Sequence, residues 1–398
     1  MPQIDLPLPL RQRAPDLHAR RRAALLAATG GARLVIFGMG SALGAGTRSH
    51  GRLRFLTGWD SHESASLFLL APDGCRLLLA SPFMAPAASE LVPDLNPEHL
   101  PTGLWSQAVT AFLGSESCAV VGLDEMPLGI YRSLAALLDP ATDVTPAIDA
   151  LRQVKEPAAM TLHRDGAAIC DRVFAALADE IAPGRSGRDS QRVLEGIALQ
   201  HGAEYCRSWL TIRPAADHPR YWPEETAREA QTGDQILFGI ALMVDGHWAH
   251  GLRMGHLGPV PHALRSLHAG VNQALNAGLA ALVPGCPVTE AKQAMTAHID
   301  ALALEFPDYN AHTFRSGHAL GLTYEEPGLT QAFPQTFGQH PEPPLPGPGP
   351  ILRPGMVLEL HPNLFLSGLG GAALGQMIEI TAQGAAVMLD TPCSLLEL

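Results

Sequence analysis

Residues 316–322 read Ser-Gly-His-Ala-Leu-Gly-Leu and place His318 in a short, well-patterned segment of the second half of the chain. Two other histidines have a similar setting: His250 in VDGHWAHGLR at 244–253, and His361 in GMVLELHP at 355–362. A neutral imidazole is the commonest transition-metal ligand, and it also titrates near neutral pH. Three such side chains would form a site if the fold brings them together.

The composition is that of an ordinary globular protein with few charges. The chain has 398 residues, of which 46% are hydrophobic and 17% charged, and its formal net charge is −12. This length exceeds what one hydrophobic core usually supports, so we expect two domains. Lysine occurs only at Lys155 and Lys292, and the arginines are scattered. The charge pattern therefore argues against a nucleic-acid partner.

Cysteine spacing and hydropathy bear on the compartment. The six cysteines are far apart and form no Cys-x-x-Cys pair, which favours reduced, mostly buried thiols over a disulfide framework or a zinc ribbon. The first residues lack the pattern of a secretory signal, and no run of about 18 apolar residues occurs. We therefore expect a cytoplasmic protein without a membrane partner.

Two patterns of secondary structure divide the chain near residues 140–157. Residues 1–150 alternate helices and short apolar strands, which predicts an α/β domain with a small covered sheet. In residues 151–398 long helices are expected at 158–182, 188–201, 262–283 and 288–304. Strands are expected at 205–212, 235–244, 247–254, 356–365 and 376–381. Asp245-Gly246 predicts an antiparallel hairpin, and the prolines of 339–350 predict a loop.

Several short motifs follow one another in a recognisable order. They are Phe55-Leu56-Thr57-Gly58-Trp59, Leu151-Arg152-Gln153-Val154-Lys155-Glu156, Gly233-Asp234, Pro284-Gly285, Gly317-His318-x-x-Gly321-Leu322, Glu326-Pro327 and Gly355-Met356-Val357. In this order they resemble the creatinase/aminopeptidase P/prolidase family. The resemblance implies a creatinase-like α/β domain at 1–150 and an α+β pita-bread domain at 151–398. That second domain would have a curved, mainly antiparallel sheet covered by helices. It also implies a homodimer.

The resemblance does not carry over the metal ligands of the family peptidases, which bind two ions through two Asp, one His and two Glu. By position, these five ligands fall on Gly239, His250, His318, His361 and Gly375. Glu379 lies four residues beyond the last position. Two ions about 3.5–4 Å apart need bridging carboxylates, so we do not expect a typical dinuclear aminopeptidase.

Metal-free creatinase is the other precedent in the family, and its residues are not retained either. Its general-base His falls on Trp222, and its substrate-binding Glu positions fall on Leu252 and His361. His218 is a possible substitute for the base if the loop is spaced differently. We assign His218, Trp222 and Glu326 to substrate binding, and creatine hydrolysis itself is not expected.

His250, His318 and His361 all fall at ligand positions of one of the two metals. They predict a mononuclear site for one divalent transition metal, Zn, Fe or Cu, with a metal-free site as the alternative. Glu359 lies two residues before His361 on the same strand face, so it is expected to hydrogen-bond a ligand imidazole or to be an edge-strand charge. His247 is expected on the opposite face from His250.

We predict an enzyme that hydrolyses a C–N bond, of the amide or amidine type, in a small amino-acid-like molecule. The catalytic residues would be Glu325 as general acid or base, His318, and Arg253, which either clamps a carboxylate or pairs with a buried acid. Two alternatives remain open: an oxidative Fe or Cu enzyme on the three histidines, and a non-catalytic binding module. Asp60, His62 and Glu63 either reach a partner subunit's site or form a surface loop.

Overall fold

The computed structural model describes residues 6–217, 227–333 and 347–398. The chain forms two compact units. The smaller comprises 8–153 with 321–324, and the larger contains 154–320 and 325–398. Of the helices within the described ranges, none is long and apolar enough to cross a membrane.

The smaller unit is built on one mixed six-stranded sheet. Its order is β4-β3-β2-β1-β5-β6, with β1 Arg33–Met39, β2 Ala65–Ala71, β3 Gly74–Leu79, β4 Pro97–His99, β5 Cys118–Val121 and β6 Thr142–Asp143. Neighbours β1, β2 and β3 pair antiparallel, whereas β4, β5 and β6 pair parallel to their partners. This mixed pairing agrees with the α/β layout expected from the alternation of helices and strands.

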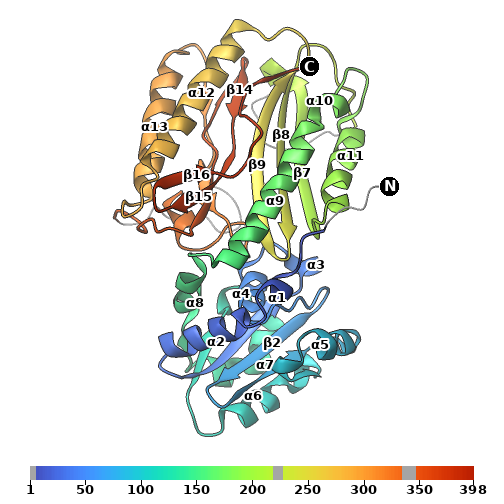
Figure 1. Ribbon diagram of the computed structural model, residues 1–398, viewed down its shortest axis with the longest axis vertical. Coiled ribbons are helices and arrows are strands. Elements are labelled where there is room, and N and C mark those ends of the chain that lie inside the picture. Colours follow the sequence, from blue (N-terminus) through green and yellow to red (C-terminus); the bar gives the residue numbers. More distant parts are fainter. Residues whose placement is uncertain (1–5, 218–226, 334–346) are drawn as a thin grey trace. The chain divides into compact units, whose positions relative to one another are not determined.

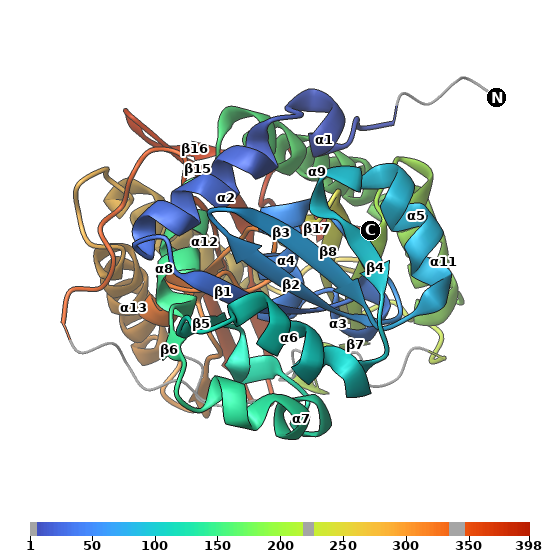
Figure 2. The same cartoon turned by 90° about the horizontal axis from the view of Figure 1, so that it is seen from below.

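Both faces of this sheet are covered by helices. Alternate residues of β1 point to opposite sides of the sheet, and each set packs with different helices. Leu34 and Ile36 pack with α2 Leu17–Ala28, α4 Arg48–Thr57, α5 Ala85–Leu91 and α8 Thr145–Arg152. Val35 and Phe37 pack with α6 Trp105–Leu113 and α7 Leu128–Leu138 on the other side. Figure 2 shows α6 and α7 together at one side of the strands. The short α1 Leu10–Arg13 and α3 Ser41–Gly44 complete the unit.

The described residues of the larger unit form three sheets. One has the order β17-β9-β8-β7, formed by β7 Tyr205–Pro214, β8 Asp234–Val244, β9 His247–His256 and β17 Leu396–Glu397. A second has the order β11-β12-β15-β16, with β11 Gly317–Ala319, β12 Val357–Leu360, β15 Gln376–Thr381 and β16 Gly384–Val387. The third joins β10 Ala311–His312, β13 Asn363–Leu366 and β14 Gly370–Ala373.

The predicted hairpin between β8 and β9 is confirmed. The two strands pair antiparallel from Gln235 opposite His256 to Val244 opposite His247. Asp245 and Gly246 have positive φ values of 43° and 80°, and such a pair forms the two-residue turn that matches the twist of a hairpin. Helix α9 Pro157–Ala175 packs against these two strands, and α11 Gly187–Gln200 packs against β7 and α9 (Figure 1). The short α10 Leu177–Glu180 follows α9.

The predicted single strand at 356–365 is wrong. The chain leaves one sheet after Leu360 and enters another at Asn363, so that β12 and β13 are separate strands. The break coincides with Pro362, which has no N–H to donate to a continuous ladder. The predicted helix at 158–182 is likewise divided, into α9 and α10.

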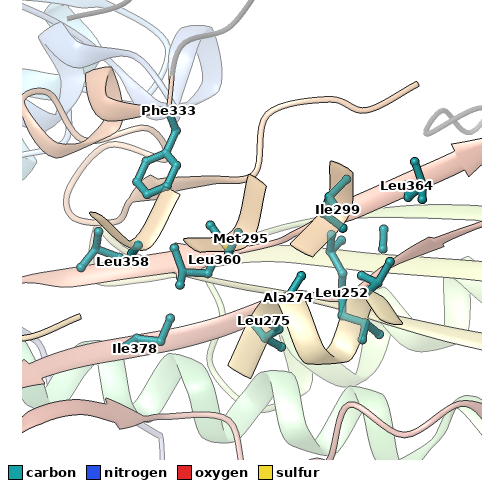
Figure 3. Close-up of a cluster of buried hydrophobic side chains, with 14 of the residues drawn as sticks. Leu252, Ala274, Leu275, Met295, Ile299, Phe333, Leu358, Leu360, Leu364 and Ile378 are labelled. Atoms are coloured by element: carbon teal, nitrogen blue, oxygen red, sulfur yellow. The ribbon is translucent and has the colours of Figure 1, made fainter. Parts of the chain in front are cut away.

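One hydrophobic cluster supports β12, and Figure 3 shows part of it. Leu358 and Leu360 of β12 pack with Leu275 of α12 His262–Ala281, Met295 of α13 Thr289–Leu304, and Ile378 of β15. These residues are at most 2% exposed, so their apolar surface is almost fully removed from water. The packing fixes which face of β12 is turned toward the helices.

Candidate metal centre

The alternation of β12 determines where its polar residue points. Because Leu358 and Leu360 face the hydrophobic cluster, Glu359 between them projects from the opposite face. It lies directly across from His318 of β11 in the antiparallel register. His361 follows just after the strand, where its N–H donates to the carbonyl oxygen of Ser316 at 2.8 Å. Local strand geometry thus gathers His318, Glu359 and His361, and His250 joins them from β9.

The carboxylate of Glu359 lies at the centre of the three histidines. Its Oε2 is 2.5 Å from His250 Nδ1, 3.3 Å from His318 Nε2 and 3.6 Å from His361 Nε2. Glu359 is 0% exposed, His250 and His318 are each 1% exposed, and His361 is 5% exposed. A buried carboxylate requires compensating partners, and here these are imidazoles.

Ring contacts hold the imidazoles in place. The rings of His250 and His318 stack with centroids 5.5 Å apart, and the His318 and His361 centroids are 5.4 Å apart. Two aromatic rings flank the cluster. The ring centroid of Trp209 is 5.5 Å from that of His250, and the ring centroid of Phe314 is 5.8 Å from that of His361. Such packing restricts rotation of the rings and keeps water from them.

The electrostatics favour an ionised Glu359 carboxylate and neutral rings at His250 and His361. Burial alone would raise the pKa of Glu359, but the attraction and hydrogen bonds of its histidine partners outweigh burial and hold that pKa well below its usual range. Burial lowers the pKa of His361 to about 3, against the opposing attraction of Glu359. Burial also lowers the pKa of His250. Neutral imidazoles have a lone pair to offer to a cation.

The hydrogen bond of His318 indicates that a proton or a metal ion belongs between its ring and Glu359. His318 Nδ1 lies 3.1 Å from the carbonyl oxygen of Ala319, which can only accept, so Nδ1 carries the proton. Nε2 of the neutral ring is then an acceptor, and it faces another acceptor, Glu359 Oε2, at 3.3 Å. Ligand atoms of a tetrahedral zinc site are also about 3.3 Å apart, given Zn–N bonds of about 2.0–2.1 Å. The residues fit a metal ion on this side of the carboxylate.

The predicted set of three histidine ligands differs from the group in the structure. In the described part of the chain, one group of three or more potential ligands has donor atoms that all lie within 4.8 Å of one another, and it consists of His250, His318 and Glu359. His361 is not part of this group, although it approaches Glu359. Glu359, which was expected to hydrogen-bond a ligand imidazole or to be an edge-strand charge, is the third member of this group.

Gly375 explains how the carboxylate fits. A Cβ atom at this position would lie 2.2 Å from Glu359 Oε1 and 2.6 Å from the backbone nitrogen of Leu252. Leu252 and Gly375 form an isolated antiparallel bridge between β9 and the start of β15. Glycine thus admits the Glu359 carboxylate and the close approach of two strands. The sequence signal that could have revealed this arrangement is the glycine at position 375, combined with Glu359 and His361 two residues apart on one strand face.

Arg253 lies on the opposite face of β9 from His250, because the two positions differ by an odd number. Its guanidinium donates to the carbonyl oxygens of Leu252 at 2.8 Å and Gly375 at 2.7 Å, and it lies 4.5 Å above the ring centroid of Phe174. This arrangement does not support the predicted catalytic role. Arg253 instead stabilises the bridge between Leu252 and Gly375 by donating to both carbonyl oxygens. The expected partner was a buried acid.

The other predicted catalytic and substrate-binding residues are arranged differently from expectation. Glu325 pairs with the buried Arg315, Nη1 to Oε1 at 2.7 Å, so its carboxylate is already engaged. Glu326 is 1% exposed, and its N–H donates to the Ala319 carbonyl oxygen beside His318. His218 and Trp222 lie outside the described residues.

The remaining candidates contact other parts of the protein. His247 packs edge-on against His163 with ring centroids 5.2 Å apart, away from the ring contacts of His250. Glu379 pairs with Arg164 at 2.6 Å. In the smaller unit, Asp60 accepts hydrogen bonds from the backbone of Ser41 and His62 and so stabilises its own loop. Glu63 is an exposed residue of that loop.

Comparison with known proteins identifies relatives of this chain. The family model of metallopeptidase family M24 matches residues 161–382. The probable dipeptidase PepE of Mycobacterium bovis is 27% identical over 296 residues, 72% of each protein. The agropine synthesis cyclase of Rhizobium rhizogenes is 26% identical over 274 residues, 64% of this chain and 63% of that protein.

A solved structure agrees with the fold. The crystal structure of dipeptidase PepE from Mycobacterium ulcerans superposes with a TM-score of 0.76 at 23% identity, covering 96% of this chain and 98% of that one. With the family match, this likeness confirms the predicted pita-bread architecture and the resemblance on which it was based.

Proposed function

The chain belongs to metallopeptidase family M24, and from this premise we propose that it hydrolyses a C–N bond of the amide or amidine type in a small amino-acid-like molecule. We propose further that one divalent metal ion, held by His250, His318 and Glu359, serves this reaction. The observation that carries the proposal is the convergence of these three buried side chains, with donor atoms within 4.8 Å of one another. One relative is named a cyclase, so family membership does not by itself specify a peptide substrate.

A single ion is proposed because, among the described residues, the group of potential ligands contains one carboxylate, that of Glu359. A dinuclear site needs carboxylates that bridge two ions about 3.5–4 Å apart. The first and last ligand positions of the family fall on Gly239 and Gly375, which have no donor side chain. Two histidines and one glutamate are also the protein ligands of well-known catalytic zinc sites.

A bound ion would polarise the carbonyl group of the substrate and activate a water molecule. The chain's own residues prepare the donors. The Ala319 carbonyl fixes the tautomer of His318, so that Nε2 is the donor atom, and Trp209 and Phe314 shield the outer imidazoles. A fixed tautomer keeps the ligand lone pair pointed at the site.

We assign proton transfer to His361, since Glu325 is engaged by Arg315. His361 Nδ1 is buried and has no hydrogen-bond partner within the described residues. Because burial lowers the pKa of His361 to about 3, the ring is neutral near pH 7, and a proton taken up at Nδ1 would be held only transiently before it is passed on. Glu359, 3.6 Å from the other ring nitrogen, would stabilise the resulting positive charge.

A second function is favoured by the same donor set. Two histidines and one carboxylate with open positions also bind Fe(II) in non-haem oxygenases. The observation is again His250, His318 and Glu359. This alternative predicts bound iron and oxygen consumption, whereas the hydrolase needs neither.

Metal analysis of protein purified without added metal, followed by activity assays, tests the proposal. We expect about one equivalent of Zn or another divalent ion, lost in His318→Ala, with oxygen-independent release of amine from dipeptides or small amides. Glu379→Gln is the control, because Glu379 pairs with Arg164. A protein that binds no ion at equimolar metal and releases no amine would instead be a non-catalytic binding module. The expected homodimer and the cytoplasmic location remain predictions, and sedimentation analysis tests the former.

A further inference from the structure

A cavity of about 240 Å³ lies between helix α13 and the segment 313–316. Helix α13 contributes Lys292, Met295, Thr296, Ile299 and Asp300 to its lining. These positions follow the i, i+3, i+4, i+7, i+8 spacing, so they lie along one face of the helix. Neither the three residues of the proposed metal centre nor His361 lines this cavity. It is therefore a separate opening in the larger unit.

The lining has charges at two ends and an apolar floor. Met295, Ile299 and Phe333 belong to the hydrophobic cluster of Figure 3. Within the described residues, the side chains of Lys292 and Asp300 form no hydrogen bond or ion pair. The third charged residue of the lining, Arg315, is already paired with Glu325. They are eight residues apart on the helix, which corresponds to about 12 Å along its axis. A cation and an anion are thus presented at separate positions over apolar side chains.

This pattern matches a small zwitterion with an apolar body. The cavity volume corresponds to roughly eight water molecules at about 30 Å³ each. Two extended residues span at most about 7 Å, and the flexible lysine side chain can shorten the distance that a ligand must cover. We propose that the cavity is a second binding site, which takes a zwitterion of dipeptide size with its carboxylate at Lys292 and its ammonium group at Asp300.

The walls of the cavity also hold His361 in place. Phe314, Ser316 and Asn363 line the cavity. Ser316 accepts the N–H of His361 at 2.8 Å, and Asn363 Nδ2 donates to the His361 carbonyl oxygen at 3.0 Å. Phe314 packs against the His361 ring. A ligand in the cavity contacts the residues that position His361, so occupancy is coupled to the histidine cluster. This inference does not depend on hydrolysis.

Calorimetric titration of the full chain with the dipeptide alanyl-leucine tests the site, with metal chelated so that the peptide is not hydrolysed at the proposed metal centre. We expect one dipeptide bound in the cavity of the wild type, and at least tenfold weaker binding in Lys292→Met and in Asp300→Asn. Glu290→Gln, on the same helix but outside the lining, should bind as the wild type does. N-acetyl-alanyl-leucine amide, which lacks both end charges, should not bind.

Two further measurements separate this site from the metal centre. His318→Ala should keep the alanyl-leucine binding, and the ring resonances of His361 should shift on titration of the wild type and not of Lys292→Met. Absence of binding at millimolar peptide, or binding that Lys292→Met and Asp300→Asn leave unchanged, would overturn the inference. Binding lost only in His318→Ala would place the peptide at the histidine cluster and also overturn it. None of these readouts requires the proposed hydrolysis.

Discussion

Replacement of Glu359 by glutamine distinguishes two roles for this residue: a metal ligand, or only an ion-pair partner of the histidines. The two side chains have the same shape, but glutamine is uncharged. Its amide oxygen can accept from His250 Nδ1, which lies 2.5 Å from Glu359 Oε2. Its amide nitrogen can donate toward His318 Nε2, the acceptor that now lies 3.3 Å from the carboxylate. We therefore expect Glu359→Gln to fold and, without metal, to lose less than about 1 kcal/mol of unfolding free energy.

The magnitude of the metal effect follows from linkage. An ion at one hundred times its Kd stabilises the wild type by about 2.7 kcal/mol. For a unit of this size, that gain raises Tm by roughly 5–10 °C. If the loss of the only anionic ligand, Glu359, weakens binding a hundredfold, the same metal concentration stabilises the variant by only about 0.4 kcal/mol. The metal-dependent rise in Tm should then fall to about 1 °C.

Thermal and urea unfolding, each with metal chelated and with Zn²⁺ added, measure both quantities. Glu379→Gln is the matched control: Glu379 also belongs to this sheet, but its partner Arg164 has a side chain that is 57% exposed. Such exposed pairs contribute about 0–1 kcal/mol, and the metal response should not change. A loss of about 3–5 kcal/mol in metal-free Glu359→Gln is the value for breaking a buried ion pair. That loss, with no metal response in the wild type, would refute the reasoning.

Three other predictions concern nearby and distant residues. Gly375→Ala should lower the unfolding free energy by about 2 kcal/mol and weaken metal binding, because its Cβ would lie 2.2 Å from Glu359 Oε1; urea unfolding and metal titration measure the two effects. Arg253→Met should cost about 3 kcal/mol by urea unfolding, since buried carbonyl partners lose their donor. Burial lowers the pKa of His50 to about 4, so the unfolded chain binds a proton below pH 6.5 that the folded chain does not. The stability of the smaller unit should therefore be constant above that pH and fall by about 2.5 kcal/mol on going from pH 7.5 to 4.5, and His50→Asn should abolish the fall.

Local rules predicted the fold where one residue type determines the backbone. Asp245-Gly246 predicted the β8–β9 hairpin because both positions adopt positive φ. The strand expected at 356–365 was wrong because its apolar pattern was followed past Pro362, although proline cannot continue a ladder. Hydropathy gives the length of an apolar run, and it does not reveal that the chain changes sheets within that run.

The sequence predicted only part of the site. The order of the motifs identifies individual residues, but it does not show which side chains contact one another in the fold. His250 and His318 were identified from their places in the motif series, and the structure brings both to Glu359. The central position of Glu359 depends on the register that sets it opposite His318, which one sequence does not reveal. The engagement of Glu325 by Arg315 likewise depends on a loop conformation that the sequence pattern does not specify.

Gly375 and the carboxylate of Glu359 lie in direct contact at the centre of the site. The position at which the family resemblance places the last carboxylate is glycine, and the neighbouring strand supplies a carboxylate whose Oε1 lies 2.2 Å from where a Cβ of residue 375 would be. The centre therefore has one carboxylate, that of Glu359, and its other potential ligands are imidazoles. Two divalent ions would leave about three uncompensated positive charges in a buried site, which is prohibitively costly. One ion leaves a single positive charge, and a bound hydroxide would neutralise it. The charge of the donors thus supports the proposed single ion over a pair of ions, independently of their geometry.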